Sequence, residues 1–491
     1  MPGLCERILL KDHILSSVLA DLQSSQAAKL ADAVLFGQRP QGLGAPAFDL
    51  SRRLQAITTT ALSLEERLDH VIGVCGATVG ATVDENTLAG TQPSLFDDCP
   101  CVRIKSELKT QSTIAPTFAM TTQSSRCAVI LPEAKAKVEI RSFDVMPPEE
   151  GHITVKMEFA GICGTDPHLW KGDFPLPGPV ILGHEGIGIV HALHDSVKTD
   201  HASQPLAVGD RVYWAAVRPC QSCYYCTVLD DECGCPNNFF MHQFEEAVAA
   251  RGTWSTYTEF ATLGPRNAFY KVDHSVPPDT FIALGCALPT VLQAIAHLPG
   301  GVIKPDENIL IQGAGAVGLA AIMMAKISGA NKVIVIEANK LRMAKATEFG
   351  ADLCLDITQT TGESRAKTIS DALGFRGVTL AFECSGVLGA VAEGLHLLGR
   401  NGRYMLIGTW AGQGEVGFDP FVAVNKALTI QGSTYCAPRD YHNAVRLIEK
   451  NHHRFPVASS VSHRFALVDT EKGLETVLSG EAVKAVIQLD L

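Results

Sequence analysis

"ENILIQGAGAVGLAAIMMAKISGANKVIVIEAN", residues 307–339, decides the fold of the second half of the chain. An apolar run, "NILIQ", leads into a glycine-rich turn, an apolar stretch of helical length follows, and "KVIVIE" closes the segment. A strand, a turn, a helix and a strand in this order form a βαβ unit, whose two strands lie parallel in one sheet. The sequence therefore predicts a doubly wound, parallel α/β domain over residues 287–431.

The turn of this unit has the pattern G-x-G-x-x-G, formed by Gly313, Gly315 and Gly318. The first two glycines let the backbone turn and approach a pyrophosphate, and the third lets the helix pack closely on the strand. The N-terminal amides of the helix then point at the anion. Glycines are common in ordinary turns, but here the strand and the helix complete the pattern, so we expect a dinucleotide site.

Glu337 ends the second strand, about 20 residues after the last glycine, where a carboxylate accepts hydrogen bonds from ribose hydroxyls. The same carboxylate repels a 2′-phosphate, and each ~1.4 kcal/mol of repulsion weakens binding tenfold. NAD is therefore expected as the cofactor. Lys340 and Arg342 follow closely and leave NADP as the alternative.

A cysteine-rich stretch begins at Cys220, "CQSCYYCTVLDDECGC", and holds five of the fifteen cysteines of the chain. So local a cluster does not make a disulfide framework, whereas thiolates on one tight loop build a closed, tetrahedral structural zinc site. Cys220, Cys223 and Cys226 are the first three expected ligands. The fourth is Cys235 or Cys233, and we prefer Cys235.

Three more motifs carry metal-binding side chains at widely separated positions. "CGTDPH" begins at Cys163, "GHE" contains His184 and Glu185, and "LGCALPT" contains Cys286. Each alone fits an ordinary structural role, because a histidine beside glycine or a cysteine before a helix commonly belongs to a core. Two thiolates and an imidazole gathered from separate loops, however, form the open type of zinc site, which keeps one position for water or substrate.

The order of these motifs resembles that of the zinc-containing medium-chain alcohol dehydrogenases. C-G-T-D-x-H, G-H-E, the cysteine lobe, G-C-x-x-x-T and G-x-G-x-x-G follow one another, and the resemblance covers about residues 126–491. It implies a GroES-like, β-rich catalytic domain over residues 126–286 and 432–491, interrupted by the Rossmann domain. The expected fold class is α/β, a GroES-like domain plus a doubly wound parallel sheet.

By this resemblance, Cys163, His184 and Cys286 hold a catalytic zinc. The metal lowers the pKa of a zinc-bound alcohol so that the alkoxide passes hydride to the nicotinamide. Glu185 matches a carboxylate next to the ligands or one that exchanges with them. The family therefore implies two Zn²⁺ per chain, one catalytic and one structural.

The remaining catalytic assignments also come from the resemblance. Asp166 matches the acid that orients the ligand histidine, and Thr165 and His168 match the groups that carry the released proton to solvent. Thr290 matches a residue near the nicotinamide ring. The simpler alternatives are that Asp166 only caps a helix and that His168 only faces solvent.

The predicted function is a zinc-dependent, NAD-linked dehydrogenase that acts on an alcohol, or on its aldehyde or ketone, as a homo-oligomer by family analogy. A zinc-free NADPH reductase of enones or quinones is one alternative, although such relatives lack the catalytic ligands. A non-catalytic binding protein on the same fold is the other, and the intact relay of Thr165 and His168 argues against it.

Composition excludes other classes of partner. The chain has 491 residues and a formal net charge of −11 with no basic run, so we expect neither nucleic acid nor an anionic membrane surface as a partner. No apolar stretch reaches the roughly 20 residues that span a bilayer. Glu6, Lys11 and Asp12 interrupt the place of a signal-peptide core. A cytoplasmic protein is expected.

Residues 1–112 have no counterpart in the family and are expected to be mainly helical. Leu15, Val18, Leu19 and Leu22 recur at helical spacing. The segment contains no chemical motif, so a fused domain, an interaction module and an inherited fragment all stay open. Residues 113–125 are polar and Thr/Ser-rich and are expected to be a linker.

Overall fold

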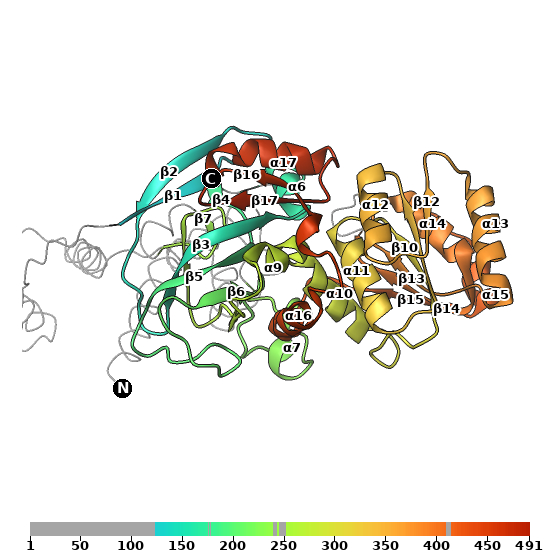
Figure 1. Cartoon of the computed structure of the whole chain (residues 1–491), viewed down its shortest axis with the longest axis horizontal. Coiled ribbons are helices and arrows are strands. Elements are labelled where there is room, and N and C mark those ends of the chain that lie inside the picture. Colours follow the sequence, from blue (N-terminus) through green and yellow to red (C-terminus); the bar gives the residue numbers. More distant parts are fainter. Residues whose placement is uncertain (1–122, 175, 177, 239–242, 245–251, 409–413) are drawn as a thin grey trace, which may run out of the picture. The chain divides into compact units, whose positions relative to one another are not determined.

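The structure is a computed structural model that describes residues 123–491 except 175, 177, 239–242, 245–251 and 409–413 (Figure 1). The predicted helical extension and most of the predicted linker lie outside the described residues. The first strand begins at Ser124, within the range expected as linker. The Ser125 hydroxyl lies 2.9 Å from the Thr258 hydroxyl, a contact between distant segments that a reading of local polarity does not reveal.

The second half of the chain forms a six-stranded sheet in the order β12-β11-β10-β13-β14-β15, and every pair in it is parallel. This finding confirms the predicted doubly wound domain. Its elements are β10 Asn308–Gln312, α11 Ala316–Ile327, β11 Lys332–Glu337, α12 Lys340–Glu348, β12 Leu353–Asp356, α13 Gly362–Leu373, β13 Val378–Glu383, α14 Leu388–Leu397, β14 Leu398–Leu406, α15 Pro420–Lys426 and β15 Thr429–Gly432.

Alternate residues of the central strands enter separate cores on the two faces of this sheet. Ile309 and Ile311 of β10 pack in the cluster that contains α11, whereas Leu310, between them, packs in the cluster that contains Leu373 of α13. Helices therefore cover both faces, as Figure 1 shows for α11 and α13. Burial on both faces explains why these strands read as continuous apolar runs in the sequence.

The β-rich part contains two largely antiparallel sheets, ordered β2-β1-β4-β7 and β16-β17-β3-β5-β6-β9, with β8 also paired to β3. Its strands are β1 Ser124–Ile130, β2 Val138–Asp144, β3 Ile153–Ile162, β4 Val180–Ile181, β5 Glu185–Leu193, β6 Arg211–Trp214, β7 Gln243–Phe244, β8 Phe260–Leu263, β9 Phe269–Lys271, β16 Val461–Phe465 and β17 Lys484–Gln488. Because β17 pairs with β3, the end of the chain returns to the sheet that begins near residue 153.

Helices connect and cover these sheets. They are α6 Thr165–Lys171, α7 Tyr224–Thr227, α9 Pro278–Leu284, α10 Ala287–Ala296, α16 Pro438–Asn451 and α17 Thr470–Leu478. Within the described ranges, no single helix is long and apolar enough to cross a bilayer; α9 and α10 pass that test only as a bent pair, and most of their residues are buried.

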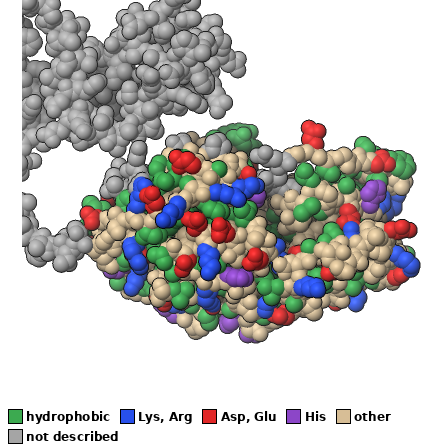
Figure 2. Space-filling view, turned by 90° about the horizontal axis from the view of Figure 1, so that it is seen from above, with side chains coloured by type: hydrophobic (Ala, Val, Ile, Leu, Met, Phe, Trp, Pro, Cys, Tyr) green, Lys and Arg blue, Asp and Glu red, His purple; other side chains and the backbone are tan. Residues whose placement is uncertain are grey.

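Acidic and basic side chains alternate over the face of the molecule seen in Figure 2. Blue and red groups lie beside one another there, with hydrophobic and neutral atoms between them. That face therefore carries no continuous basic surface of the kind that follows a nucleic-acid backbone.

Candidate active site

The pairing of β3 with β5 brings the first two predicted zinc ligands together. Gly161 of β3 lies opposite Glu185 of β5 in an antiparallel register. Cys163 directly follows β3 and His184 directly precedes β5, so the two side chains leave neighbouring strand ends. Cys286 reaches the same place from the N-terminus of α10. One ligand atom from each of Cys163, His184, Glu185 and Cys286 lies within 4.8 Å of the others.

The spacing of these atoms fits a zinc ion. The Sγ atoms of Cys163 and Cys286 are 3.5 Å apart. Two sulfurs bound at about 2.3 Å to one tetrahedral zinc are separated by about 3.8 Å. His184 is buried, and its Nδ1 lies 3.5 Å from Asp166 Oδ1, which leaves Nε2 as the atom that faces a metal. Two thiols and one imidazole are a known catalytic zinc donor set.

Close contacts and burial shift the pKa values of the three candidate zinc ligands. The hydrogen bond between the two thiols, followed by the nearby His184, holds the pKa of Cys163 well below its ordinary value. The same contact and burial raise the pKa of Cys286. Burial opposes protonation of His184, but the charge of Asp166 and its hydrogen bond outweigh burial and raise the pKa of the ring. Without a metal, these contacts keep protons on Cys286 and His184, and a divalent ion bound by the same atoms would displace those protons.

The Glu185 carboxylate is held from two sides. Its Oε1 accepts a hydrogen bond of 3.0 Å from the backbone N–H of Cys286, and its Oε2 pairs with Nζ of Lys484. Both charged side chains are buried. Burial alone would raise the pKa of Glu185, but Lys484 outweighs it and lowers that pKa. Sequence reasoning missed Lys484, because it stands 299 positions away and no motif surrounds it.

Asp166 contacts both Cys163 and His184. Its Oδ2 accepts hydrogen bonds of 2.9 Å from the backbone N–H of Cys163 and 2.9 Å from the hydroxyl of Tyr257. Its Oδ1 faces His184, as the orienting role would require. Asp166 is fully buried, so these contacts do more than cap a helix. Tyr257 is a second residue that sequence reasoning missed.

Thr165 and His168 lie three positions apart on α6, so their side chains share one face of the helix. Thr165 Oγ1 is 3.7 Å from Cys163 Sγ, while His168 is about one-third exposed. His168 Nδ1 lies 2.6 Å from Asp173 Oδ2, and that contact, together with Lys171, lowers the pKa of Asp173. An ionised Asp173 accepts a hydrogen bond from Nδ1–H of His168, which leaves Nε2 as the ring's acceptor. Asp173 also went unnoticed in the sequence.

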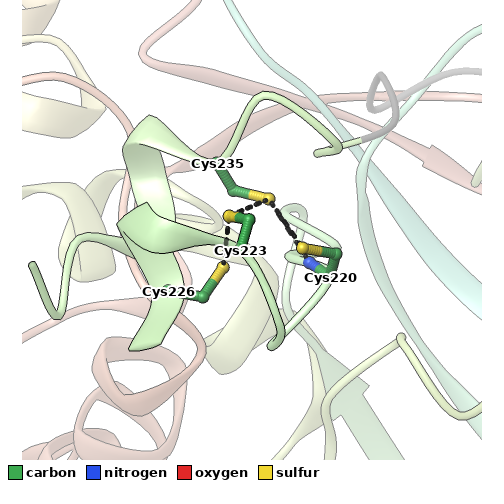
Figure 3. A group of neighbouring side chains, drawn as sticks. All are labelled: Cys220, Cys223, Cys226 and Cys235. Atoms are coloured by element: carbon green, nitrogen blue, oxygen red, sulfur yellow. Dashed lines mark hydrogen bonds between the residues drawn. The ribbon is translucent and has the colours of Figure 1, made fainter. Parts of the chain in front are cut away.

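The cysteine lobe forms a second candidate metal centre, shown in Figure 3. Cys223 Sγ lies 3.5 Å from the sulfur of Cys226 and 3.8 Å from that of Cys235, and the sulfurs of Cys235 and Cys220 are 3.6 Å apart. These distances again match the edge of a tetrahedron of sulfurs around zinc. The group contains Cys235 and leaves Cys233 out.

Hydrogen bonding and burial separate the cysteines of this lobe. The Asn237 side chain donates to Cys220 Sγ and, with Ser222, lowers the pKa of Cys220 to about 5, which favours a thiolate. Burial and the adjacent sulfurs raise the pKa of Cys226 to about 12, so several thiolates do not coexist easily without a cation. Burial raises the pKa of Cys233 to about 12 as well.

The glycine-rich turn has the geometry that the motif predicts. Gly313 has φ +91°, which favours glycine, and a Cβ on Gly318 would lie 2.0 Å from the carbonyl oxygen of Gly313. A Cβ on Gly315, by contrast, would meet no protein atom within 4 Å. The first and third glycines therefore shape the turn, and the second presents an open backbone to a ligand.

Glu337 ties this turn to the end of β11. Its Oε2 accepts a 2.6 Å hydrogen bond from Ala314 N–H, and its Oε1 accepts from the backbone of Ala338 and Asn339. The carboxylate is thus fixed beside the glycines before any ribose arrives. Arg342 donates to the carbonyl of Ala482, whereas Lys340 is exposed.

Thr290 lies on α10, one helical turn after Cys286. Its hydroxyl donates a 2.8 Å hydrogen bond to the Cys286 carbonyl. The residue expected beside the nicotinamide therefore also fixes the helical turn that begins at a candidate zinc ligand.

Comparison with known proteins places the chain in a family. Residues 149–271 match the alcohol dehydrogenase GroES-like domain, and residues 316–450 match the zinc-binding dehydrogenase family. A 5-exo-hydroxycamphor dehydrogenase from Pseudomonas putida is 36% identical over 370 residues, 75% of this chain and 100% of that protein. A sorbitol dehydrogenase from Halalkalibacterium halodurans is 26% identical, covering 69% of this chain and 92% of its own length.

A solved structure shows the same architecture. The crystal structure of an alcohol dehydrogenase from Thermotoga maritima aligns with a TM-score of 0.69 at 30% identity, over 74% of this chain and 99% of that one. The expected GroES-like and Rossmann fold is therefore confirmed, as is the expected dehydrogenase class. The chain belongs to the zinc-containing medium-chain alcohol dehydrogenases, oxidoreductases that use zinc and a nicotinamide cofactor on small-molecule alcohols.

Proposed function

We propose that this protein is a zinc-dependent, NAD-linked alcohol dehydrogenase with two zinc ions per chain. The meeting of Cys163, His184 and Cys286 at ligand spacing is the observation that carries the proposal. Zinc held there would supply a Lewis acid that lowers the pKa of an alcohol hydroxyl, and the nicotinamide would take the hydride.

The chain's own residues would handle the proton. Thr165 lies next to Cys163 and would accept the proton of the substrate hydroxyl. His168, on the same helix face and partly exposed, would pass it to solvent through Nε2. Asp173 would hold the ring by Nδ1 and keep it in the tautomer that accepts a proton at Nε2. A binding protein without catalysis has no use for such a chain of groups.

Glu337 supports NAD as the cofactor. Its carboxylate is buried at the glycine turn, and three backbone N–H groups hold it there. A 2′-phosphate would meet this fixed negative charge, while ribose hydroxyls would donate to it. Arg342 points to the Ala482 carbonyl and so is not placed to compensate the phosphate. A zinc-free NADPH reductase has neither this preference nor the three metal ligands.

A bulky, cyclic secondary alcohol is the substrate class that we favour. The relative aligned over its entire length is named for 5-exo-hydroxycamphor, a secondary alcohol on a rigid bicyclic frame. The relatives named for sorbitol and xylulose are 26–29% identical over less of the chain. The higher identity supports an apolar ring over a linear polyol.

We also propose that the chain forms a homo-oligomer. In the described part of the sheet, β15 is one of the two edge strands, and its backbone can pair with another strand. Exposed apolar side chains lie on β15 itself, on α15 and just before α15: Ile430, Phe421, Val424 and Phe418. Such a patch beside an open edge suits a second copy of the chain.

Replacing Cys163 by serine tests the catalytic zinc. We expect wild-type protein to carry about two zinc ions and the Cys163→Ser variant about one. Its kcat/KM should fall on the order of 10³-fold or more, because the metal contributes several kcal/mol to the reaction. NADH binding, followed by fluorescence titration, should stay within about twofold. Cys354→Ser, in the Rossmann domain, is the matched control and should change none of these values. Full turnover by Cys163→Ser would refute the mechanism.

Serine substitutions in the cysteine lobe identify the fourth structural ligand. Cys235→Ser should lose one zinc and several degrees of melting temperature, since a structural zinc contributes directly to folding. Cys233→Ser should keep both zinc ions. Metal analysis and thermal unfolding of the two variants measure the difference. The reverse pattern would assign the ligand to Cys233.

A panel of alcohols with each cofactor measures specificity through the absorbance of the reduced nicotinamide. Bicyclic and monocyclic secondary alcohols should give higher kcat/KM than sorbitol or short primary alcohols. NAD⁺ should exceed NADP⁺ by at least about tenfold, the effect of ~1.4 kcal/mol of repulsion. A preference for polyols would overturn the substrate class, and a preference for NADP⁺ would overturn the role of Glu337.

A further inference from the structure

We propose that two buried tyrosines, Tyr257 and Tyr213, are positioning residues that hold the two halves of the catalytic zinc site at ligand spacing. The inference rests on the proposed function and deepens it. Neither tyrosine touches a ligand sulfur or the ligand imidazole through its hydroxyl. Each instead donates a hydrogen bond to the group that fixes a ligand's position.

Tyr257 supports the half formed by Cys163 and His184. Its hydroxyl donates to Asp166 Oδ2, the oxygen that also accepts from the Cys163 backbone. With Oδ2 held by two donors, the other oxygen of Asp166 is directed at His184. The Tyr257 hydroxyl thus fixes the Asp166 carboxylate. That carboxylate in turn holds the backbone of Cys163 and the ring of His184 in position.

Backbone hydrogen bonds also tie the segment around Tyr257 to the residues just before the ligand His184. Tyr257 N–H donates to the Leu182 carbonyl, and Thr256 N–H donates to the Gly183 carbonyl, directly before His184. Gly183 has φ +87°, and a Cβ there would lie 2.4 Å from the Tyr257 ring. Position 183, next to the ligand His184, therefore requires glycine, because the Tyr257 ring packs against it.

Tyr213 supports the half formed by Cys286. It lies on β6, which pairs with β5, and it is almost completely buried. Its hydroxyl donates a 2.6 Å hydrogen bond to the carbonyl of Gly285, the residue before Cys286. The N–H of Cys286 donates to Glu185. The peptide group that carries this ligand is thus held at its oxygen by Tyr213 and at its nitrogen by Glu185.

Loss of either hydroxyl should loosen zinc binding more than it loosens the fold. Groups that orient metal ligands typically change metal affinity by about 10–100-fold when they are replaced. The tyrosine hydroxyls contact the groups that hold the ligands and not the ligands themselves. We therefore expect each substitution to weaken zinc affinity by about tenfold, the lower end of that range. Phenylalanine keeps the ring, and the packing around it is therefore retained.

The test compares Tyr257→Phe and Tyr213→Phe with Tyr404→Phe in the zinc-loaded, full-length protein. Tyr404 is also buried, and its hydroxyl donates a 2.6 Å hydrogen bond to Gln312 in the Rossmann sheet. The Tyr404→Phe variant therefore measures how much stability is lost when a buried hydroxyl far from the candidate metal site is removed. Zinc transfer to a chromophoric chelator is followed over time, with zinc release from the cysteine lobe as the internal reference and the melting temperature measured alongside.

Release from the catalytic site should be about tenfold faster in Tyr257→Phe and in Tyr213→Phe, and unchanged in Tyr404→Phe. The cysteine-lobe phase should stay the same in all three. Cobalt-substituted Tyr257→Phe and Tyr213→Phe should show altered ligand-field bands, and excess zinc should restore their activity. If one variant fails to fold, the other still tests the proposal, since the tyrosines lie in different segments.

Equal release rates in the wild type and both variants would overturn the positioning role. So would equal acceleration in the Tyr404→Phe control, because the effect would then be general destabilisation. If the wild-type protein retains no zinc at Cys163, His184 and Cys286, the proposed function itself fails. The two failures are therefore distinguishable.

Discussion

The antiparallel pairing of β3 with β5 is the constraint on which the active site depends. It places the residue after one strand beside the residue before the other, so Cys163 and His184 meet although 20 residues separate them in the chain. β17 then pairs with the opposite edge of β3 and delivers Lys484 to the buried Glu185. A slip of one position in either register would turn these side chains to the other face of the sheet.

The site is built from charges that are expensive to bury. Asp166, Glu185 and Lys484 are all nearly inaccessible to solvent, and each is tolerated only because oppositely charged or hydrogen-bonding groups surround it. The Glu185–Lys484 pair is almost neutral as a unit, and so it positions Cys286 without adding a full negative charge beside the metal. The charge of Asp166 is compensated by the Cys163 N–H and the Tyr257 hydroxyl, which donate hydrogen bonds to it, and by His184.

Two kinds of signal made the site predictable: local spacing within a loop, and the order of motifs shared with the family, which joined Cys163, His184 and Cys286 although the first and the last stand 123 positions apart. The glycine turn and the cysteine lobe each lie within about one loop, and their spacing limits what they can form. Tyr257, Tyr213, Lys484 and Asp173 could not be identified from the sequence. The first three act on residues 72 to 299 positions away, and no motif distinguishes a tyrosine or lysine of this kind from any other. Only Asp173 lies close in the chain to its partner, five positions after His168, and this short spacing is the one local signal among the four. Glu337 was expected to face a ribose, and its further bond to the glycine turn depends on side-chain orientation that no spacing reveals.

Anomalous X-ray diffraction across the zinc absorption edge tests the central claim most directly. Crystals of the full chain should show a peak bounded by Cys163 Sγ, His184 Nε2 and Cys286 Sγ, at about 2.3 Å from the sulfurs and about 2.0 Å from the nitrogen. A map with a peak only at the cysteine lobe, and none among these three side chains, would contradict the account.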